Sequence, residues 1–344
     1  MSHDEHGALA AATPHAAAGH APPLDSAGVL TEQAFVDSLR GLGADYYHDK
    51  HPFHVRMYNG KLSREEIQGW VACRYYYQTQ IPIKDSLIMA KPDSGPMRRE
   101  WIRRVVDHDG NRDNPGGLLL WLDLAEAVGL DRAATERFEL LTPEAKAAVD
   151  SYVSFVAEHP LFDCIAASLT ELFAGGIHQS RLDVWPKHYP WIPSKGYQYF
   201  SSRIAIAPGD AQWSLNYVRQ HAVTADLQRR AREALLHKLG LLWNLATAIQ
   251  ERFTPGAAEW KPRLTNMAKL RWDEIDKVHM LLLPEKGMKL NPAAGNILQR
   301  CDGTRTQREV AGALREAFPA GHPVEIDIST MIFIDQMLGK GILE

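Results

Sequence analysis

The sequence predicts an all-α helical bundle followed by a small α+β domain. Nearly every periodic segment between about residues 29 and 253 has the spacing of a helix, and no convincing strand pattern interrupts these segments. After a stretch that contains proline and glycine, the pattern changes to a short apolar run with alternation, which is typical of β-strands. With 344 residues, of which 45% are hydrophobic, the chain is long enough for two domains with a large core.

Composition argues against several classes of protein. The formal net charge is −4, so no overall positive field indicates a nucleic-acid-binding protein. The 3 cysteines are far apart and form no Cys-x-x-Cys motif, which argues against a disulfide scaffold and is typical of a reducing cytoplasm. No stretch approaches the roughly 18 consecutive apolar residues of a membrane span. We therefore expect a cytoplasmic protein that binds neither nucleic acid nor membrane.

Residues 1–28 are predicted to form a disordered N-terminal tail. The stretch "MSHDEHGALAAATPHAAAGHAPPLD" has early acidic residues, and histidines and prolines break up its alanines. It lacks the basic start and leucine-rich run of a signal peptide. Its histidines could bind a metal adventitiously, although a solvated tail is the simpler interpretation.

Helix-start signals define the bundle, for which we expect about seven or eight helices over residues 29–253. Ser63 and Glu66 form a capping box before "EEIQGWVACRYYYQ". Pro82, further along this helix, predicts a kink because proline cannot donate to the carbonyl oxygen four residues earlier. Other helices are indicated by Ser94, Pro96 and Gly110, by Thr142, Pro143 and Glu144, and by a long periodic stretch from about Thr224 to Phe253.

The C-terminal part has a different character. Residues 254–267 contain two prolines and a glycine with little periodicity, so they are predicted to be a linker. Residues 268–344 are predicted to form the α+β domain, which begins with the β-like stretch "VHMLLLPEKGMKL". Two helices are expected after it, the second starting at the capping box of Thr306 and Glu309. A last helix is expected over about Ile328 to Leu338.

A lysine on the core-facing side of the longest helix is the clearest functional signal. Lys238 lies on the same apolar stripe as Leu235 and Leu242. Such a lysine can extend its ammonium group to an edge of the bundle. It can also mark an internal anion site, because burial of an unpaired charge costs several kcal/mol.

Other helices repeat this pattern. Arg104 and His108 share a face with a tryptophan, while Tyr75 and Tyr76 turn away from the polar face of their helix and are expected to pack between helices. Further polar side chains are grouped in "GWVACRYYYQTQIPIKD" (Arg74, Tyr77, Gln78, Lys84), "YYHDKHPFH" (His48, His51, His54), "LTELFAGGIHQSR" (Thr170, Glu171, His178, Arg181) and "GYQYFSSRI" (Tyr199, Ser202, Arg203).

Many cations and tyrosines with few carboxylates favour a small, polyanionic and aromatic ligand held inside the bundle. A metal site is less compatible with the pattern, because a di-iron bundle needs paired Glu-x-x-His motifs, which we do not find. Neither a Gly-x-Gly-x-x-Gly nor a Walker motif indicates a dinucleotide or ATP.

At these same residues the sequence resembles a known family. Four stretches closely resemble the pyrroloquinoline-quinone synthase (PqqC) family: "HDKHPFHVRMYNGKLSREEIQGWVACRYYYQTQIPIKD", "RRVVDHDG", "SLTELFAGGIHQSR" and "GYQYFSSR". The resemblance covers residues 29–253 in order. It implies a heme-oxygenase-like, TENA-type bundle that works as a homodimer. It also implies closure of the last ring of a tricarboxylate quinone precursor and its eight-electron oxidation by molecular oxygen, with release of hydrogen peroxide and with neither metal nor organic cofactor.

The resemblance also implies which residues surround the ligand. Arginines and lysines suit the carboxylates, and a histidine suits removal of protons from carbon near neutral pH. We assign His108 as the principal acid/base and His178 as a second proton-transfer group. Tyr199, His178 and Arg203 are candidates for an oxygen pocket, and Lys238 for closing the site. The residues implied to bind substrate are His48, Arg74, Tyr77, Gln78, Lys84, Arg104, Tyr152, Thr170, Glu171, Arg181 and Ser202.

Residues 268–344 resemble the PqqD family of peptide-binding proteins, so the chain is similar to a fusion of the two families. This implies a winged-helix-like domain whose partners are the precursor peptide of the pathway and the radical-SAM enzyme that crosslinks it. Such a domain can add a peptide strand to a sheet edge, for which Val278–Leu290 is the candidate. The alternative is an appendage that only stabilises the fold.

Three other functions stay open on sequence alone. A thiaminase-like hydrolase needs a cysteine on the inner face, where Cys73 and Cys164 are weak candidates without an evident histidine partner. A metal-dependent oxidase needs bound iron. A carrier that stores the quinone fits an internal anion site equally well.

Overall fold

The structure is a computed structural model that describes residues 28–92 and 94–344, apart from the side chains of residues 205–208. The tail predicted for residues 1–28 therefore lies, except for Gly28, outside the described residues. The described chain divides into two compact units, one that ends at Pro255 and one that comprises Gly256–Glu344. None of the described helices is both long and apolar enough to span a membrane.

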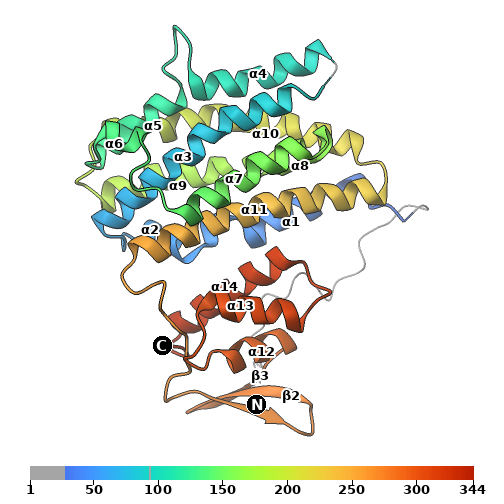
Figure 1. Cartoon of the computed structure of the whole chain (residues 1–344). Coiled ribbons are helices and arrows are strands. Elements are labelled where there is room, and N and C mark those ends of the chain that lie inside the picture. Colours follow the sequence, from blue (N-terminus) through green and yellow to red (C-terminus); the bar gives the residue numbers. More distant parts are fainter. Residues whose placement is uncertain (1–27, 93) are drawn as a thin grey trace, which may run out of the picture. The chain divides into compact units, whose positions relative to one another are not determined.

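The N-terminal unit is a bundle of α-helices, as predicted (Figure 1). In this bundle α3 lies against α4, α5 and α7, α11 lies against α3, α7 and α8, and α10 packs along α9. The helices are α1 (Glu32–Tyr46), α2 (Pro52–Tyr58), α3 (Arg64–Met89), α4 (Gly95–Asp109), α5 (Gly116–Ala127), α6 (Arg132–Glu136), α7 (Pro143–Glu158), α8 (Leu161–Ala167), α9 (Glu171–His188), α10 (Gln198–His221) and α11 (Ala225–Phe253). Short 3₁₀ turns lie at His48–Lys50, Ser168–Thr170 and Ser194–Tyr197. The sequence missed α6 and α8, because their 5 and 7 residues are too few to show a helical period.

Most of the predicted helix ends are confirmed. Ser63 forms both hydrogen bonds of its capping box with Glu66, and Thr224 caps α11. Gly110 ends α4 with φ of 83°, a conformation that favours glycine. The prediction that Ser94 caps α4 is only partly confirmed. Ser94 occupies the N-cap position, but its side chain makes no capping hydrogen bond. The helix predicted to kink at Pro82 does not end there, since α3 continues to Met89.

An aromatic cluster holds the centre of the bundle. Trp70 of α3 contacts Trp121 of α5 and Trp185 of α9, with ring centroids 5.5 and 5.7 Å apart, and all three indoles are buried. Tyr75 and Tyr76 pack against Phe138 instead, as expected for the side of α3 that faces away from the polar face. Buried aromatic rings thus fix α3 against its neighbours and leave the other face of α3 free to line a site.

The C-terminal unit combines a sheet with three helices, in agreement with the predicted α+β domain (Figure 1). Its antiparallel strands have the order β1 (Lys269–Asp273), β2 (Val278–Leu283) and β3 (Lys286–Lys289). The helices are α12 (Pro292–Arg300), α13 (Gln307–Ala317) and α14 (Pro323–Gly339). Leu281, Ile297, Val310 and Phe333 belong to its buried core.

Three details of this unit differ from the sequence prediction. β2 is the central strand and pairs on both sides, so within Val278–Leu290 only β3 lies at an edge, and β1 forms the other edge. α14 begins at Pro323, ahead of the predicted start at Ile328, because His322 acts as an unusual N-cap. The segment predicted as a linker is partly integrated, since Leu264 packs on the core and pairs with Leu343.

Candidate active site

A cavity inside the bundle, which we call the chamber, brings together most of the predicted site residues. Its wall is formed by α3, α4, α7, α9, α10, α11 and the 3₁₀ turn before α9. Fourteen of the sixteen predicted residues line it: Arg74, Tyr77, Gln78, Lys84, Arg104, His108, Tyr152, Thr170, Glu171, His178, Arg181, Tyr199, Arg203 and Lys238.

The two others, His48 and Ser202, are not on the chamber wall. His48 is buried, with its ring 4.5 Å from the ring of Tyr47, which does line the chamber. Ser202 donates from its hydroxyl to the carbonyl oxygen of Tyr199 at 2.8 Å, within its own helix. The resemblance implied that Ser202 binds substrate, and this bond turns its hydroxyl back to the backbone.

Lys238 is buried within the bundle, with 2% of its surface exposed, so it does not extend to an edge. Its ammonium group donates to the hydroxyl of Tyr77 at 2.8 Å and lies 3.5 Å from the ring centroid of Tyr152. Burial, together with the positive charges of Lys84 and Arg74, holds the pKa of Lys238 well below its usual value. Of the two interpretations open from the sequence, the internal anion site is the one this geometry supports.

Lys84 is also buried, but its charge is compensated. Its ammonium group lies 2.6 Å from Asp85, whose carboxylate also accepts from the indole N–H of Trp101 at 2.9 Å. Sequence reasoning gave Asp85 no role. The adjacent charges in "KD" were the available signal, although sequence does not show that two neighbours on a helix both face inward.

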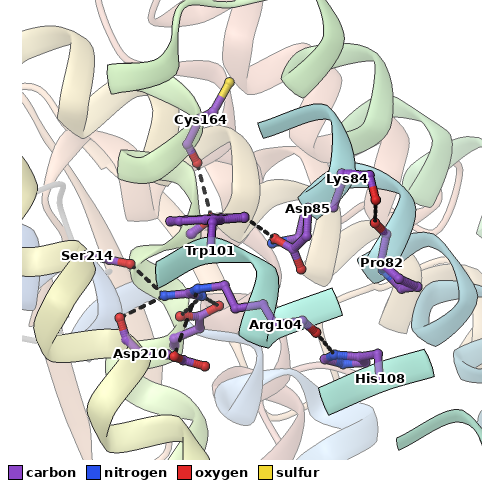
Figure 2. Close-up of polar contacts among 12 residues, drawn as sticks. Pro82, Lys84, Asp85, Trp101, Arg104, His108, Cys164, Asp210 and Ser214 are labelled. Carbon is purple, nitrogen blue, oxygen red and sulfur yellow. Dashed lines mark hydrogen bonds and ion pairs between the residues drawn. The ribbon is translucent and has the colours of Figure 1, made fainter. Parts of the chain in front are cut away.

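Arg104 joins three helices through its guanidinium group (Figure 2). One nitrogen donates to both carboxylate oxygens of Glu171 at 2.5 Å, and another donates to the backbone oxygen of Asp210 and the hydroxyl of Ser214, each at 2.9 Å. The guanidinium also stacks on Trp101 at 4.2 Å. The sequence did not identify Asp210 and Ser214 as site residues. A buried arginine needs hydrogen-bond acceptors, but its position in the sequence does not indicate which helix supplies them.

His108 is a neutral base in this setting. Its Nδ1 lies 3.1 Å from the carbonyl oxygen of Arg104 (Figure 2). A carbonyl only accepts, so Nδ1 carries the proton and Nε2 holds the lone pair. Burial, followed by the positive charge of Arg203, lowers the pKa of His108 to about 3. Its Nε2 therefore stays unprotonated over the whole neutral range.

The candidate oxygen pocket is assembled from neighbouring side chains. The hydroxyl of Tyr199 donates to Gln78 at 2.8 Å, and the ring of Tyr199 lies 5.9 Å from His178 and 5.5 Å from the guanidinium of Arg203. Arg203 donates to the backbone oxygen of Asp107 at 3.0 Å. Burial and the positive charge of Arg181 hold the pKa of His178 well below its usual range, so this ring is also neutral.

The chamber carries more positive charge than negative. Its wall contains six basic residues and four acidic ones, the latter being Asp85, Asp107, Glu171 and Asp210. Carboxylates pair with Lys84 and Arg104. Among the described residues, no carboxylate lies within 4.0 Å of the four other cations, Arg74, Arg181, Arg203 and Lys238. A ligand with several carboxylates matches this uncompensated charge.

The chamber offers little for two of the alternative chemistries. Cys73 and Cys164 lie outside its wall, each donates to a backbone oxygen, and burial raises the pKa of each thiol to about 11. This placement contradicts a cysteine-dependent hydrolase in the chamber. Over the part of the chain that the structure describes, no three histidine, cysteine, aspartate or glutamate side chains are grouped as a metal site requires.

Comparisons with known proteins agree with this architecture. Residues 36–248 match the TENA/THI-4/PQQC family, and residues 279–343 match Coenzyme PQQ synthesis protein D (PqqD). The chain is 47% identical to "Pyrroloquinoline-quinone synthase" of Pseudomonas syringae pv. tomato over 226 residues, 66% of this chain and 90% of that protein. It is 44% identical to the enzyme of the same name from Klebsiella pneumoniae over 243 residues, 71% of this chain and 95% of that protein.

Solved structures show the same fold at low sequence identity. A domain with a heme oxygenase-like fold from Shewanella denitrificans is 13% identical, with a TM-score of 0.52 over 64% of this chain and 91% of that one. A TenA homologue from Pseudomonas syringae is 13% identical, with a TM-score of 0.53 over 64% of this chain and 95% of that one. The chain therefore belongs to the TENA/THI-4/PQQC family, with a heme-oxygenase-like bundle joined to a PqqD domain.

Proposed function

We propose that this chain is a pyrroloquinoline-quinone synthase that acts on the ring-open quinone precursor AHQQ. It closes the last ring and removes eight electrons, with molecular oxygen as co-substrate, hydrogen peroxide as a released product, and neither metal nor organic cofactor. The observation that carries this proposal is that four basic side chains without a carboxylate partner line the same chamber as a neutral histidine. The names of the relatives that align along the bundle support it.

Substrate binding follows from the charges of the wall. Arg74, Arg181 and Lys238 are free to meet carboxylates, and a carboxylate at Lys238 restores the charge that burial disfavours. Tyr77 is held beside Lys238 by its hydroxyl and can orient the aromatic ring of the substrate. Removal of bulk water on closure strengthens each of these interactions.

The oxidation needs proton removal at carbon and a place for reduced oxygen. Nε2 of His108 accepts a proton from a carbon atom of the substrate. The substrate keeps the electron pair of the broken bond and becomes electron-rich, and its conjugated ring then passes electrons to oxygen. For each two electrons transferred, the substrate loses two protons, and one oxygen molecule takes up two electrons and two protons to give hydrogen peroxide. Arg203, beside Tyr199 and His178, supplies the positive charge that stabilises superoxide or peroxide.

The C-terminal domain has a separate task in this proposal. It binds the PQQ precursor peptide and presents it to the radical-SAM enzyme that crosslinks it, and the match to PqqD supports this assignment. β1 and β3 are the edges at which an extended peptide can add a strand. The bundle assembles as a homodimer in the same proposal.

A carrier that stores the quinone is the second candidate, because a cation-lined chamber also suits storage. It assigns no role to a histidine held neutral with a free lone pair. Single-turnover oxygen uptake with one equivalent of AHQQ separates the two functions. We expect oxygen consumption with the appearance of the quinone, whereas a carrier binds the compound and consumes no oxygen, which would overturn the proposal.

A His108→Asn variant tests the base in the same assay. We expect AHQQ to bind and quinone formation to slow by about 10²-fold or more. His221→Asn is the matched control, because His221 also directs Nδ1 to the carbonyl four residues earlier, at 2.7 Å, but is exposed at the end of α10. Unchanged turnover in His108→Asn would remove this residue from the mechanism.

A further inference from the structure

A row of buried polar rings lies next to the chamber and outside its wall. Tyr47 lines the chamber, and the row continues from it through His48 and His54 to Tyr58, with successive ring centroids 4.5, 4.7 and 6.4 Å apart. Tyr58 lines a second cavity together with Asp49, whose side chain is 40% exposed. Tyr47 lines this second cavity as well, so the row runs beside the wall that the chamber and the second cavity share, and the second cavity has solvent-exposed groups in its wall.

The contacts between the two histidines define where their protons lie. Nδ1 of His54 is 2.6 Å from the carbonyl oxygen of His48, and a carbonyl only accepts, so this nitrogen carries a proton. The same Nδ1 is 3.1 Å from Nδ1 of His48, which must then be the acceptor. His48 therefore carries its proton on Nε2, and Nε2 of His54 holds a lone pair.

This arrangement has a direction. The hydroxyl of Tyr58 is a donor on the side of Nε2 of His54, which is an acceptor. On the other side of this ring, Nδ1–H of His54 donates to Nδ1 of His48. The remaining group, Nε2–H of His48, is a donor at the end of the row nearer the chamber. Among the described residues, no protein atom hydrogen-bonds to Nε2 of His48, Nε2 of His54 or the hydroxyl of Tyr58, although all three are buried. Buried groups of this kind are commonly joined by ordered water with two to four polar partners. Nε and Nη2 of Arg181, a residue of the chamber wall, also lack a protein partner and can complete such a site.

We propose that Tyr58, His54 and His48 form a proton relay between the second cavity and the chamber. The relay rests on the proposed oxidase function, in which reduced oxygen must take up protons. A proton enters at Nε2 of His54, the proton on Nδ1 of His54 passes to Nδ1 of His48, and the proton on Nε2 of His48 leaves towards the chamber. One proton enters and one leaves, so the relay gains no net charge, and each passage leaves both histidines in the opposite tautomer.

The charges around the relay keep it neutral at rest. Burial lowers the pKa of His48 and of His54 far below the usual value, and the positive charges of Arg74 and Arg181 act in the same direction. A protonated histidine is thus a transient carrier, and an anion such as peroxide beside Arg181 draws the proton onward. The other titratable or charged groups facing the relay are His51, Tyr47 and Asp49.

The variants Tyr58→Phe and His54→Gln test the relay in single-turnover oxygen uptake with AHQQ. We expect at least about a tenfold slower oxidation in each, an altered solvent deuterium isotope effect, and unchanged binding of the quinone product. Tyr197→Phe is the matched control, because it removes a buried hydroxyl that donates to the backbone oxygen of Ile192 at 3.3 Å, away from the chamber and the relay. Added imidazole should restore His54→Ala in proportion to its concentration, which a purely structural role does not predict.

The outcomes separate this inference from the function on which it rests. Absence of oxygen uptake by the unmodified chain overturns the oxidase function itself. Normal rates and normal isotope effects in both Tyr58→Phe and His54→Gln, beside an active unmodified chain, overturn the relay alone. A slow His54→Ala that binds product normally but does not respond to imidazole also counts against the relay.

Discussion

The burial of Lys238 imposes a chemical requirement on the ligand. The ammonium group is almost fully enclosed, its partner is the hydroxyl of Tyr77, and its pKa is held well below the usual value by burial and nearby cations. A bound carboxylate raises the pKa of Lys238, because it stabilises the charged form of the lysine. Binding of a carboxylate ligand and protonation of Lys238 are therefore coupled.

This coupling predicts proton uptake when the quinone product binds. Between the pKa of Lys238 in the free protein and its raised pKa in the complex, binding takes up one proton, so affinity falls as pH rises from the former to the latter and is constant above it. Calorimetry in buffers of different ionisation enthalpy measures this uptake. Lys238→Met should abolish it and weaken binding about 10- to 100-fold, as expected for loss of a charged hydrogen bond.

Lys146→Met is the control for this measurement, since Lys146 is 53% exposed and pairs with Asp150 on the surface of α7. It should bind the quinone like the unmodified chain and take up the same number of protons. Equal proton uptake by Lys238→Met and the unmodified chain would contradict the role given to Lys238.

Individual residues were predictable where a polar side chain interrupts an apolar stripe. Lys238 and Arg104 were found in this way, because helical periodicity alone places them inward. Asp85, Asp210 and Ser214 could not be found so easily, since they matter through contacts with residues on other turns or helices. Periodicity shows which residues face the interior but not which of them meet there.

At the scale of elements, the segment from His48 to Tyr58 is unusual because His48, His51 and His54 are all buried. Burial is the largest cause of the low pKa of His48 and His54, and the pKa of His108 in α4 and His178 in α9 is lowered for the same reason. Each of these rings resists protonation in the folded state.

The bundle should therefore lose stability in mild acid. Below about pH 6.5 these histidines protonate in the unfolded chain but stay neutral in the folded one, so the unfolded state binds more protons. The free energy of unfolding should fall by up to about 1.4 kcal/mol per pH unit for each such ring as pH falls from 6.5 towards the folded pKa. Urea midpoints between pH 7 and 5, followed by hydrogen exchange in α2 and α3, measure this loss.

His54→Gln should reduce the slope of the free energy of unfolding against pH by the contribution of about one histidine. His221→Gln, at an exposed position, should leave this slope unchanged. A slope that His54→Gln does not alter would show that His54 is not neutral in the folded state.

Element prediction succeeded where caps and periodicity agreed. α3 and α11 are confirmed at their starts because Ser63 and Thr224 form the expected caps. β1 was missed because "KLRWD" is short and largely charged, and it is a strand only through its pairing with β2. The edge predicted within Val278–Leu290 is confirmed for β3 alone, and the second edge was missed because β1 was not recognised as a strand.

At the scale of the whole molecule, two compact units carry two family matches, and the boundary between the units falls after Pro255. Every residue that lines the chamber lies before this boundary. The sequence indicated both families, each from its own stretch of the chain.

Deletion of residues 256–344 should therefore separate the two proposed tasks. We expect the shortened chain to oxidise AHQQ at close to the normal rate and to lose binding of the precursor peptide, measured by titration with labelled peptide. A folded bundle without oxidase activity would show that the tasks are not divided between the units.

The central claim is that the chamber oxidises its substrate with its own side chains and oxygen alone. Its most direct test measures oxygen uptake, quinone formation and metal content on one sample of chelator-treated full-length protein with one equivalent of AHQQ. We predict full conversion to the quinone with metal far below one equivalent per chain. Oxygen uptake that is absent, or that rises and falls with the residual metal, would contradict the claim.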